Sequence, residues 1–208
     1  MSEHDNSWIS IADVMSALMM IFMFIAVAFL YQIISQKQIY RVQLNQALHE
    51  EFNKDLPDWK AMITEDNIIR FDSPFEVGSD VVPDGFKKIL DDFFPRYIKV
   101  LTLSEFKKEI EEIRVEGHTS NGWGSADEKY SYLYNMELSQ KRTSNVLSYC
   151  YSLEDGSVYQ NIKWLQSNLR AIGMSFSNLL YKDSAKTMQD GDRSRRVEFK
   201  VVTKEHFE

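Results

Sequence analysis

A single carboxylate lies near the start of a long apolar segment. Residues 8–34 carry one charged side chain, Asp13, and residues 14–36 carry none. As a helix, residues 14–36 would be roughly 34 Å long, which is enough to cross a hydrocarbon core of about 30 Å. We therefore predict a membrane-spanning helix over residues 9–34. A carboxylate inside such a helix is costly and usually faces protein or water, so Asp13 is the candidate ion-carrying residue.

The neighbours of Asp13 fit either a pathway or a helix contact. Ser16 follows Asp13 at i+3 and shares its helix face. Ser10 and Ser16 are candidate ion-path neighbours because their hydroxyls could coordinate Na⁺, although small polar residues also pack helices together. The alternative is that Asp13 lies at the membrane interface and only caps the helix.

The short leader favours an uncleaved anchor. A signal peptide needs a basic start, a short apolar core and a small-residue cleavage site, whereas residues 1–7 read MSEHDNS and the apolar run continues into a polar helix. Residues 1–8 are then a short N-terminus. Orientation stays open at this point: Lys37 and Arg41 follow the span and the leader has no Lys or Arg, but this charge bias is small.

Composition excludes several classes of function. The net charge of -7 without a basic cluster argues against nucleic-acid binding. Cys150 is the one cysteine, so an intramolecular disulfide and a CxxC site are excluded. His118 has no second ligand at a suitable spacing, so we predict no metal site. The sequence shows no nucleophile–base pair that would indicate an enzyme. Trp123, between two glycines, could contact sugar or be an ordinary exposed loop aromatic.

A polar helix is expected to follow the membrane segment, as a linker over residues 35–65. Tyr40, Leu44, Leu48 and Phe52 recur at i+4 as one narrow apolar stripe, and Pro57 ends the pattern. Such a helix could pair with a second copy, cover the membrane helix or act as a spacer. The pattern does not distinguish these three roles.

Residues 66–208 have the pattern of one α/β domain. We predict strands at 68–71, 75–77, 113–117 and 196–202, helices at 104–112 and 130–151, and a helix-to-strand passage over 165–174. Pro83 should open a further helix, and Pro95 should stop or kink it. The predicted fold is an α/β sandwich, with a mixed sheet and helices on one face.

Three stretches of this domain resemble the OmpA-like peptidoglycan-binding domain. Residues 117–120 read G-H-T-S, residues 135–142 read N-M-E-L-S-Q-K-R, and residues 194–197 read S-R-R-V. The family patterns are G-x-T-D, N-x-x-L-S-x-x-R and N-R-R-V/I, and the likeness covers about residues 66–204. The resemblance implies peptidoglycan binding at matched positions, which are Thr119, Ser120, Asn135, Ser139, Arg142, Arg195 and Arg196.

The resemblance also implies a role for each matched residue. In the family, an arginine and a carboxylate hold the carboxylate and ammonium of diaminopimelate in a wall stem peptide. Arg142 matches that arginine, whose planar fork suits a carboxylate. Thr119 and Asn135 would orient the loop. Of Arg195 and Arg196, one would support the site and the other would pair internally.

One position departs from the family pattern. Ser120 stands where the family has Asp, so the ligand's ammonium lacks its matched carboxylate. Asp127 or Glu128 would have to supply the acid instead. Peptidoglycan affinity, or its dependence on diaminopimelate, is the property that this departure affects.

The apolar segment carries a second resemblance. Residues 12–24 are similar to the transmembrane helix of flagellar stator B subunits, the MotB-like proteins. The likeness implies a bacterial inner-membrane protein with its N-terminus in the cytoplasm and its domain in the periplasm. It also implies a homodimer inside a multi-span A-type partner, suggested to be a pentamer, that transports H⁺ or Na⁺ and needs no other cofactor.

The flanks separate this chain from flagellar members. The short acidic leader and brief linker are more similar to the stator-like ZorB subunits of Zorya anti-phage systems, whose partner is a MotA-like ZorA subunit. The expected function is therefore that of an ion-driven, wall-anchored motor subunit in anti-phage defence. The alternatives are a flagellar stator subunit and a passive wall tether without ion transport.

Overall fold

The computed structural model describes residues 4–204, and it describes side chains from Ile11 onward except those of residues 36 and 37. The chain divides into two compact units, Met1–Gln43 and Leu44–Glu208. Helix α1, His4–Phe52, begins in the first unit and ends in the second. Each unit is described by itself below.

The first unit consists of the apolar part of α1. Among the described residues, one helix is long and apolar enough to cross a membrane, and it covers Ile11–Phe52. Its large apolar side chains are exposed; Met19, for example, is 76% exposed and Phe22 is 62% exposed. An exposed apolar surface of this length is compatible with lipid or a partner protein rather than with water.

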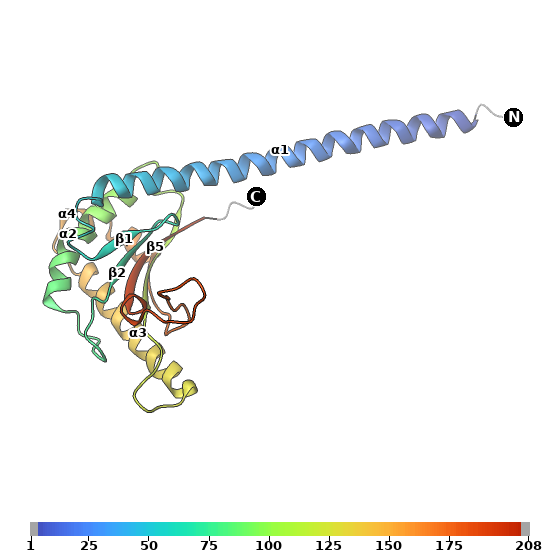
Figure 1. The fold of residues 1–208 in the computed structure, drawn as a ribbon. Coiled ribbons are helices and arrows are strands. Elements are labelled where there is room, and N and C mark those ends of the chain that lie inside the picture. Colours follow the sequence, from blue (N-terminus) through green and yellow to red (C-terminus); the bar gives the residue numbers. More distant parts are fainter. Residues whose placement is uncertain (1–3, 205–208) are drawn as a thin grey trace. The chain divides into compact units, whose positions relative to one another are not determined.

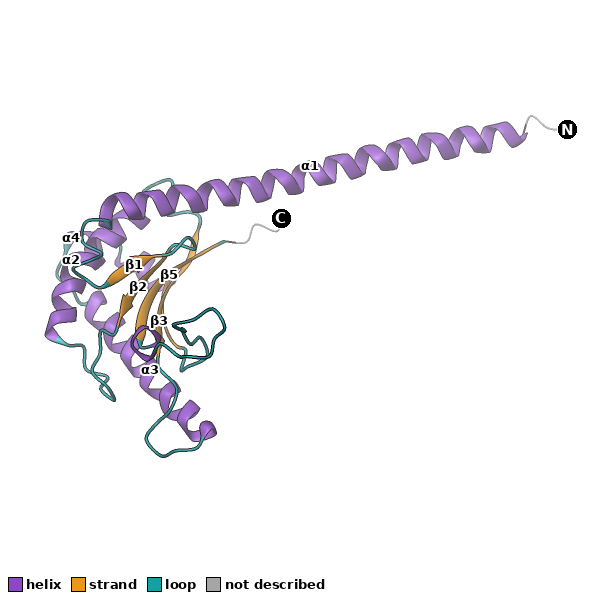
Figure 2. Ribbon diagram, viewed as in Figure 1, coloured by secondary structure: helices purple, strands orange, loops and turns teal. Residues whose placement is uncertain are grey.

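The second unit is built on a five-stranded mixed sheet with the order β1-β2-β5-β3-β4 (Figure 2). Strands β3 and β4 are parallel, and the other neighbours are antiparallel. The strands are β1 (Ala61–Ile63), β2 (Ile68–Asp72), β3 (Ile110–His118), β4 (Leu169–Gly173) and β5 (Arg196–Thr203). The helices of this unit after α1 are α2 (Asp84–Leu101), α3 (Glu128–Tyr151), α4 (Gly156–Gln160), α5 (Ile162–Asn168) and α6 (Gly191–Ser194).

The two long helices α2 and α3 cover the same face of the sheet (Figure 1). Gly117 of β3 faces α3, and its cross-strand partner Val197 lies two residues before Phe199, which contacts α2. Because side chains alternate along a strand, residues 117, 197 and 199 belong to one face. The predicted α/β fold, with a mixed sheet and helices on one face, is confirmed.

Aromatic side chains form the core between α2 and the sheet. The Phe93 ring lies 5.1 Å from Phe71 and 5.0 Å from Phe199, and it stacks on Tyr97. The Phe52 ring, from the end of α1, lies 5.3 Å from Phe93. All of these rings are essentially inaccessible to solvent. Burial of this size gives each ring about 1.5–3 kcal/mol of transfer free energy.

The end of α1 is part of this folded unit. Leu44, Leu48 and Phe52, three of the four residues of the predicted apolar stripe, are fully buried, and the unit begins at Leu44. The fourth residue, Tyr40, is half-buried and lies in the first unit. Strand β1 pairs with β2 and lies inside the segment that we expected to be a helical linker, residues 35–65. The helical linker is therefore shorter than predicted, because its stripe is covered by the domain's own core.

Two local predictions were wrong, and the predicted stop of the helix at Pro95 does not occur. Residues 75–77 form a loop rather than a strand, because the Phe75 side chain is buried against Phe86 and Arg142. Residues 104–112 form turns followed by the start of β3 rather than a helix. Helix α2 continues through Pro95, because buried residues on both sides of the proline hold it in the core.

Candidate functional site

Asp13 lies on the exposed apolar surface of α1. Ser16 and Ala17 follow at i+3 and i+4, so the three residues share one side of the helix. All three are exposed. Ser10 belongs to the same helix, but its side chain lies outside the described residues. The carboxylate therefore sits on a small, polar strip of an otherwise apolar helix.

Helix α3, which carries the matched residues 135–142, meets the sheet where β3 ends. Helix α3 approaches the sheet closely at Gly117 and Gly173. A Cβ on Gly173 would lie 2.6 Å from the Gln140 backbone nitrogen, and a Cβ on Gly117 would lie 2.8 Å from the Ser139 carbonyl oxygen. Only glycine permits this approach, which places residues 135–142 of α3 above the strand ends.

The buried side chains of Asn135 and Ser139 form hydrogen bonds that hold two segments, one at Gly122 and one at Ser175. Asn135 is buried, and its Nδ2 donates to the carbonyl oxygens of Gly122, at 3.0 Å, and Ser131, at 2.9 Å. Ser139 is buried, and its Oγ accepts from the Ser175 backbone nitrogen at 3.0 Å. Ser175 in turn accepts the backbone N–H of buried Thr119 at 2.9 Å. Asn135 bonds the Gly122 loop through its side chain, whereas Thr119 bonds Ser175 through its backbone, and the loop-orienting role expected of both residues stays a prediction.

Arg142 is engaged inside the protein rather than facing solvent. It is buried, with Nε donating to the Ser79 carbonyl and Nη2 to the Glu76 carbonyl, both at 2.7 Å. Its guanidinium lies 4.9 Å from the centre of the Phe75 ring. Burial, together with the charge of Arg195, lowers the pKa of Arg142 to about 10, so it stays charged at neutral pH. The Arg142 guanidinium, which was expected to hold a ligand carboxylate, therefore bonds the loop after β2 instead.

Arg195 and Arg196 have different surroundings. Arg196 is buried, and its Nε donates to Glu198 Oε1 at 2.6 Å while its Nη1 donates to the Asn178 carbonyl at 3.0 Å. Arg195 is 24% exposed and pairs with Asp192. Of the two, Arg196 thus makes the internal pair, and Arg195 is the one that reaches the surface near Arg142.

Ser120 is half-buried, and the two acids proposed to replace the missing Asp differ in their contacts. Asp127 is the N-cap of α3 and accepts the Tyr130 backbone N–H at 2.9 Å. Glu128 is the first residue of α3, and its side chain is exposed. The carboxylate of Asp127 therefore has a structural role, which leaves Glu128 as the available acid.

A hollow of about 300 Å³ lies beside this loop. Its lining comes from the segment after Ser120, the first turn of α3 and the segment after β4. The lining residues are Asn121, Gly122, Ala126, Glu128, Ser131, Phe176 and Leu179.

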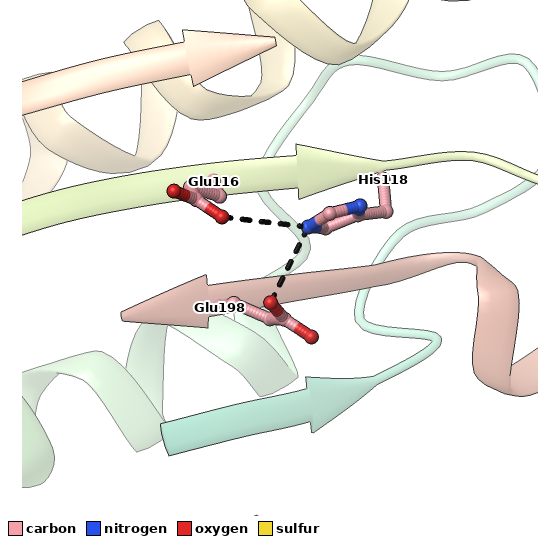
Figure 3. A group of neighbouring side chains, drawn as sticks. All are labelled: Glu116, His118 and Glu198. Carbon is pink, nitrogen blue, oxygen red and sulfur yellow. Dashed lines mark ion pairs between the residues drawn. The ribbon is translucent and has the colours of Figure 1, made fainter. Parts of the chain in front are cut away.

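On the opposite face of the sheet, His118 lies between two buried carboxylates (Figure 3). Its Nε2 is 3.4 Å from Glu198 Oε2 and 3.9 Å from Glu116 Oε2. Burial raises the pKa of Glu198, but contact with His118 and the charge of Arg196 outweigh burial and hold that pKa well below its usual range. Arg70 Nε also contacts Glu198 Oε1, at 2.8 Å.

This group of three side chains is not predicted by the sequence pattern. Their ligand atoms lie within 4.8 Å of one another, a spacing that a metal ion could bridge. The three side chains come together through the pairing of β3 with β5, in which Glu116 lies opposite Glu198 and His118 lies opposite Arg196. Only this strand pairing could have revealed the group. Two arginines already contact Glu198, so the charge of that carboxylate is compensated by the protein itself. The absence of a metal site stays a prediction.

Trp123 belongs to a small exposed aromatic group. Gly122 and Gly124 flank it with φ of 89° and 55°, a conformation that suits glycine. The Trp123 ring lies 5.6 Å from Tyr134, which stacks with Tyr130 at 6.4 Å. A sugar contact at Trp123 stays an alternative to an ordinary loop aromatic.

Two known proteins are similar to this chain over nearly its full length, whereas no family model matches it. The Zorya protein ZorB of Escherichia coli (strain Crooks) is 41% identical over 97% of this chain and 90% of its own length. The Zorya protein ZorB of Escherichia coli O139:H28 is 28% identical over 93% of this chain and 79% of its own length.

Solved structures are similar at lower identity. The cell wall anchor of the T6SS from Pseudomonas aeruginosa is 20% identical with a TM-score of 0.48, covering 76% of this chain and 97% of that one. A MotB-like protein from Desulfovibrio vulgaris is 19% identical with a TM-score of 0.46, covering 79% and 99%. The periplasmic domain of Helicobacter pylori MotB is 18% identical with a TM-score of 0.43, covering 67% and 78%.

Proposed function

The chain belongs to the family of the Zorya protein ZorB, and from this premise we propose that it is the ion-carrying, wall-anchored B subunit of a stator-type motor in the inner membrane. The motor would act in anti-phage defence. The observation that carries this proposal is one carboxylate, Asp13, on the exposed apolar surface of a helix that continues into a folded domain.

Asp13 is suited to alternate between charged and neutral forms. A low dielectric disfavours a charged group, whereas an aqueous half-channel stabilises it. Movement of one charge through 100 mV supplies about 2.3 kcal/mol, which is enough to bias a rotational step. Either H⁺ or Na⁺ would be the transported ion, and no other cofactor is required.

The remaining parts follow from the stator-type arrangement. Two copies of the chain would present their Asp13 side chains inside a multi-span A-type subunit, suggested to be a pentamer. The N-terminus would lie in the cytoplasm and the second unit in the periplasm. The second unit would bind peptidoglycan and hold the dimer still while the partner turns.

Substitution of Asp13 tests the proposal directly. We expect Asp13→Asn to abolish phage protection while the protein is made, inserted and retained on the wall at normal levels. Met15→Leu, on another face of the same helix, is the matched control and should keep most of the protection. Expression, membrane fractionation and co-sedimentation with isolated cell-wall sacculi give the required readouts. A passive tether predicts full protection by Asp13→Asn, and that result would refute ion transport.

Two further measurements separate the remaining alternatives. Deletion of the gene should remove phage protection and leave swimming intact, whereas a flagellar stator subunit predicts loss of swimming. Protection that falls with a protonophore but not with Na⁺ depletion identifies H⁺ as the ion. Protection that follows the Na⁺ concentration identifies Na⁺.

A further inference from the structure

We propose that Glu116, His118 and Glu198 bind a divalent transition-metal ion such as Zn²⁺, on the face of the sheet that α2 and α3 do not cover (Figure 3). The three side chains are 6%, 2% and 4% exposed. The sequence-based prediction of no metal site rested on spacing along the chain, whereas strand pairing supplies the further ligands. The site lies in the second unit and is independent of ion transport by Asp13.

Strands β3 and β5 place the three side chains around one point. Glu116 and His118 are two residues apart on β3, so their side chains lie on the same face of the sheet. Glu198 lies directly opposite Glu116 on β5. Three ligands from two neighbouring strands can hold an ion from one side and leave the fourth tetrahedral position to water.

His118 is a buried polar side chain without a hydrogen bond. In the part of the chain that the structure describes, neither of its ring nitrogens has a hydrogen-bond partner. A buried polar atom without a partner costs free energy, because it has lost its bonds to water. The Nε2 atom faces the carboxylates of Glu116 and Glu198 (Figure 3). An ion bound at Nε2 would replace the missing hydrogen bond.

The distances between the ligand atoms fit an ion better than a hydrogen bond. His118 Nε2 lies 3.4 Å from Glu198 Oε2 and 3.9 Å from Glu116 Oε2, and the three ligand atoms lie within 4.8 Å of one another. Hydrogen bonds between N and O are about 2.7–3.2 Å long. Bonds of about 2.0–2.2 Å to a tetrahedral Zn²⁺ place two ligand atoms about 3.3–3.5 Å apart. Glu198 already has this separation from His118, and a small rotation of the Glu116 side chain would complete the set.

Glu116 is the carboxylate whose charge the ion would neutralise. Among the described residues, its one charged contact is the 3.9 Å approach to His118. The like-charged Glu198 lies directly opposite, an arrangement that destabilises a pair of strands. An ion between the two carboxylates would replace this repulsion with an attraction to both.

Arg70 and Arg196 limit the affinity of the site. Both guanidiniums contact the same oxygen of Glu198, Oε1, at 2.8 and 2.6 Å, and they leave Oε2 to the ion. Hydrogen bonds to the other oxygen orient a ligating carboxylate. The two positive charges also repel the ion, and the site has three protein ligands rather than four. We therefore expect a Kd on the order of 10 µM, weaker than that of a four-ligand structural zinc site.

Titration of the full-length protein in detergent with Zn²⁺, after treatment with a chelator, tests the site. Calorimetry should show one Zn²⁺ per chain, and about 1 mM Zn²⁺ should raise Tm by about 5 °C. Glu116→Gln should weaken Zn²⁺ binding about 100-fold, because it removes one ligand and keeps the shape of the side chain. Glu111→Gln is the matched control, since Glu111 is an exposed acid on the same strand, and it should bind Zn²⁺ like the wild type.

Two further measurements separate loss of the site from loss of the fold. Metal-free Glu116→Gln should unfold at the wild-type Tm or above it, because no arginine among the described residues contacts the carboxylate that it removes. Co²⁺ bound to the wild type should absorb visible light as a tetrahedral site does, and His118→Gln should lose that absorption. A wild-type protein without saturable Zn²⁺ binding up to about 1 mM would overturn the proposal. Zn²⁺ binding of wild-type strength by both Glu116→Gln and His118→Gln would also overturn it, because the ion would then lie elsewhere on the chain.

Discussion

Replacement of Arg142 by Met should destabilise the second unit, because the arginine holds the loop that follows β2. The substitution removes the bonds from Nε to the Ser79 carbonyl and from Nη2 to the Glu76 carbonyl, each 2.7 Å long. It also removes the guanidinium from the Phe75 ring. Met has a similar volume and is flexible, so it fills most of the vacated space.

The expected loss of stability follows from two favourable contributions of Arg142 and one unfavourable contribution. Two hydrogen bonds from a charged donor contribute about 3–6 kcal/mol, and the contact with Phe75 adds about 1 kcal/mol. Burial of the charge opposes them: the fall in the pKa of Arg142 from 12.5 to about 10 corresponds to roughly 3 kcal/mol. We therefore expect a net loss of about 2 kcal/mol, or a fall in Tm of about 4–8 °C.

The assay combines global and local measurements on the full-length protein in detergent. Thermal unfolding followed by near-ultraviolet circular dichroism gives Tm, and hydrogen exchange gives the opening of residues 75–80. Arg142→Met should raise exchange in that loop before the domain unfolds. Lys141→Met is the matched control: its side chain pairs with Glu137 at the surface, and neither Tm nor loop exchange should change.

One result would refute this reasoning. If Arg142→Met loses binding to sacculi with Tm and loop exchange unchanged, the guanidinium acts as a ligand fork and its contacts with the loop contribute little. Asn145→Ala gives a second comparison, because Asn145 Nδ2 donates to the Asp80 carbonyl of the same loop at 2.9 Å. It should raise exchange locally with a smaller fall in Tm, since Asn145 is exposed.

Two other ion pairs give measurable predictions. Glu198→Gln should cost about 3–5 kcal/mol at pH 7, because Arg70 and Arg196 lose a buried partner. Because the pKa of Glu198 is lowered in the folded state, its contribution to the free energy of unfolding is fully present above its usual pKa of 4.5 and is lost as pH falls toward the lowered value. In urea unfolding from pH 7 to pH 3, the stability of the variant should therefore fall less steeply with acid than that of the wild type. Arg96→Met removes two contacts to Glu51, at 2.7 and 2.8 Å, that join the end of α1 to α2. It should lower the free energy of unfolding in urea by about 1–2 kcal/mol. Lys99→Met is the control, because Lys99 is exposed and its loss should not change that free energy.

The features that the sequence predicted well are those with a local signal. The absence of charge over residues 14–36 indicates a membrane helix without any knowledge of the rest of the chain. The helical spacing of Leu138, Val146, Leu147 and Cys150 predicts α3; three of them are buried and Leu147 is half-buried. The alternation of Val197, Phe199 and Val201 with charged residues marks β5 as a strand with one apolar face.

The features that it missed depend on contacts distant in sequence. Strand β1 has three residues and is defined by its pairing with β2, so it carries little pattern of its own. The loop after β2 reads as a strand because Phe75 is apolar, but its carbonyls are bonded to Arg142, about 65 residues later. His118 meets Glu198 only because two antiparallel strands bring them together.

The motif matches identify the fold more securely than they identify the binding residues. Asn135, Ser139, Arg142 and Arg196 are all buried, and each uses its polar atoms on loops or strands of the protein itself. Removing any of these side chains would leave polar groups of the protein without their bonds, whatever the domain binds. Glu128 has the opposite properties, since it is exposed, lies outside the motifs and lines the hollow at the first turn of α3. Selectivity for a wall ligand is therefore expected to follow substitutions at exposed residues such as Glu128, whereas substitutions at the four buried motif residues should first change stability.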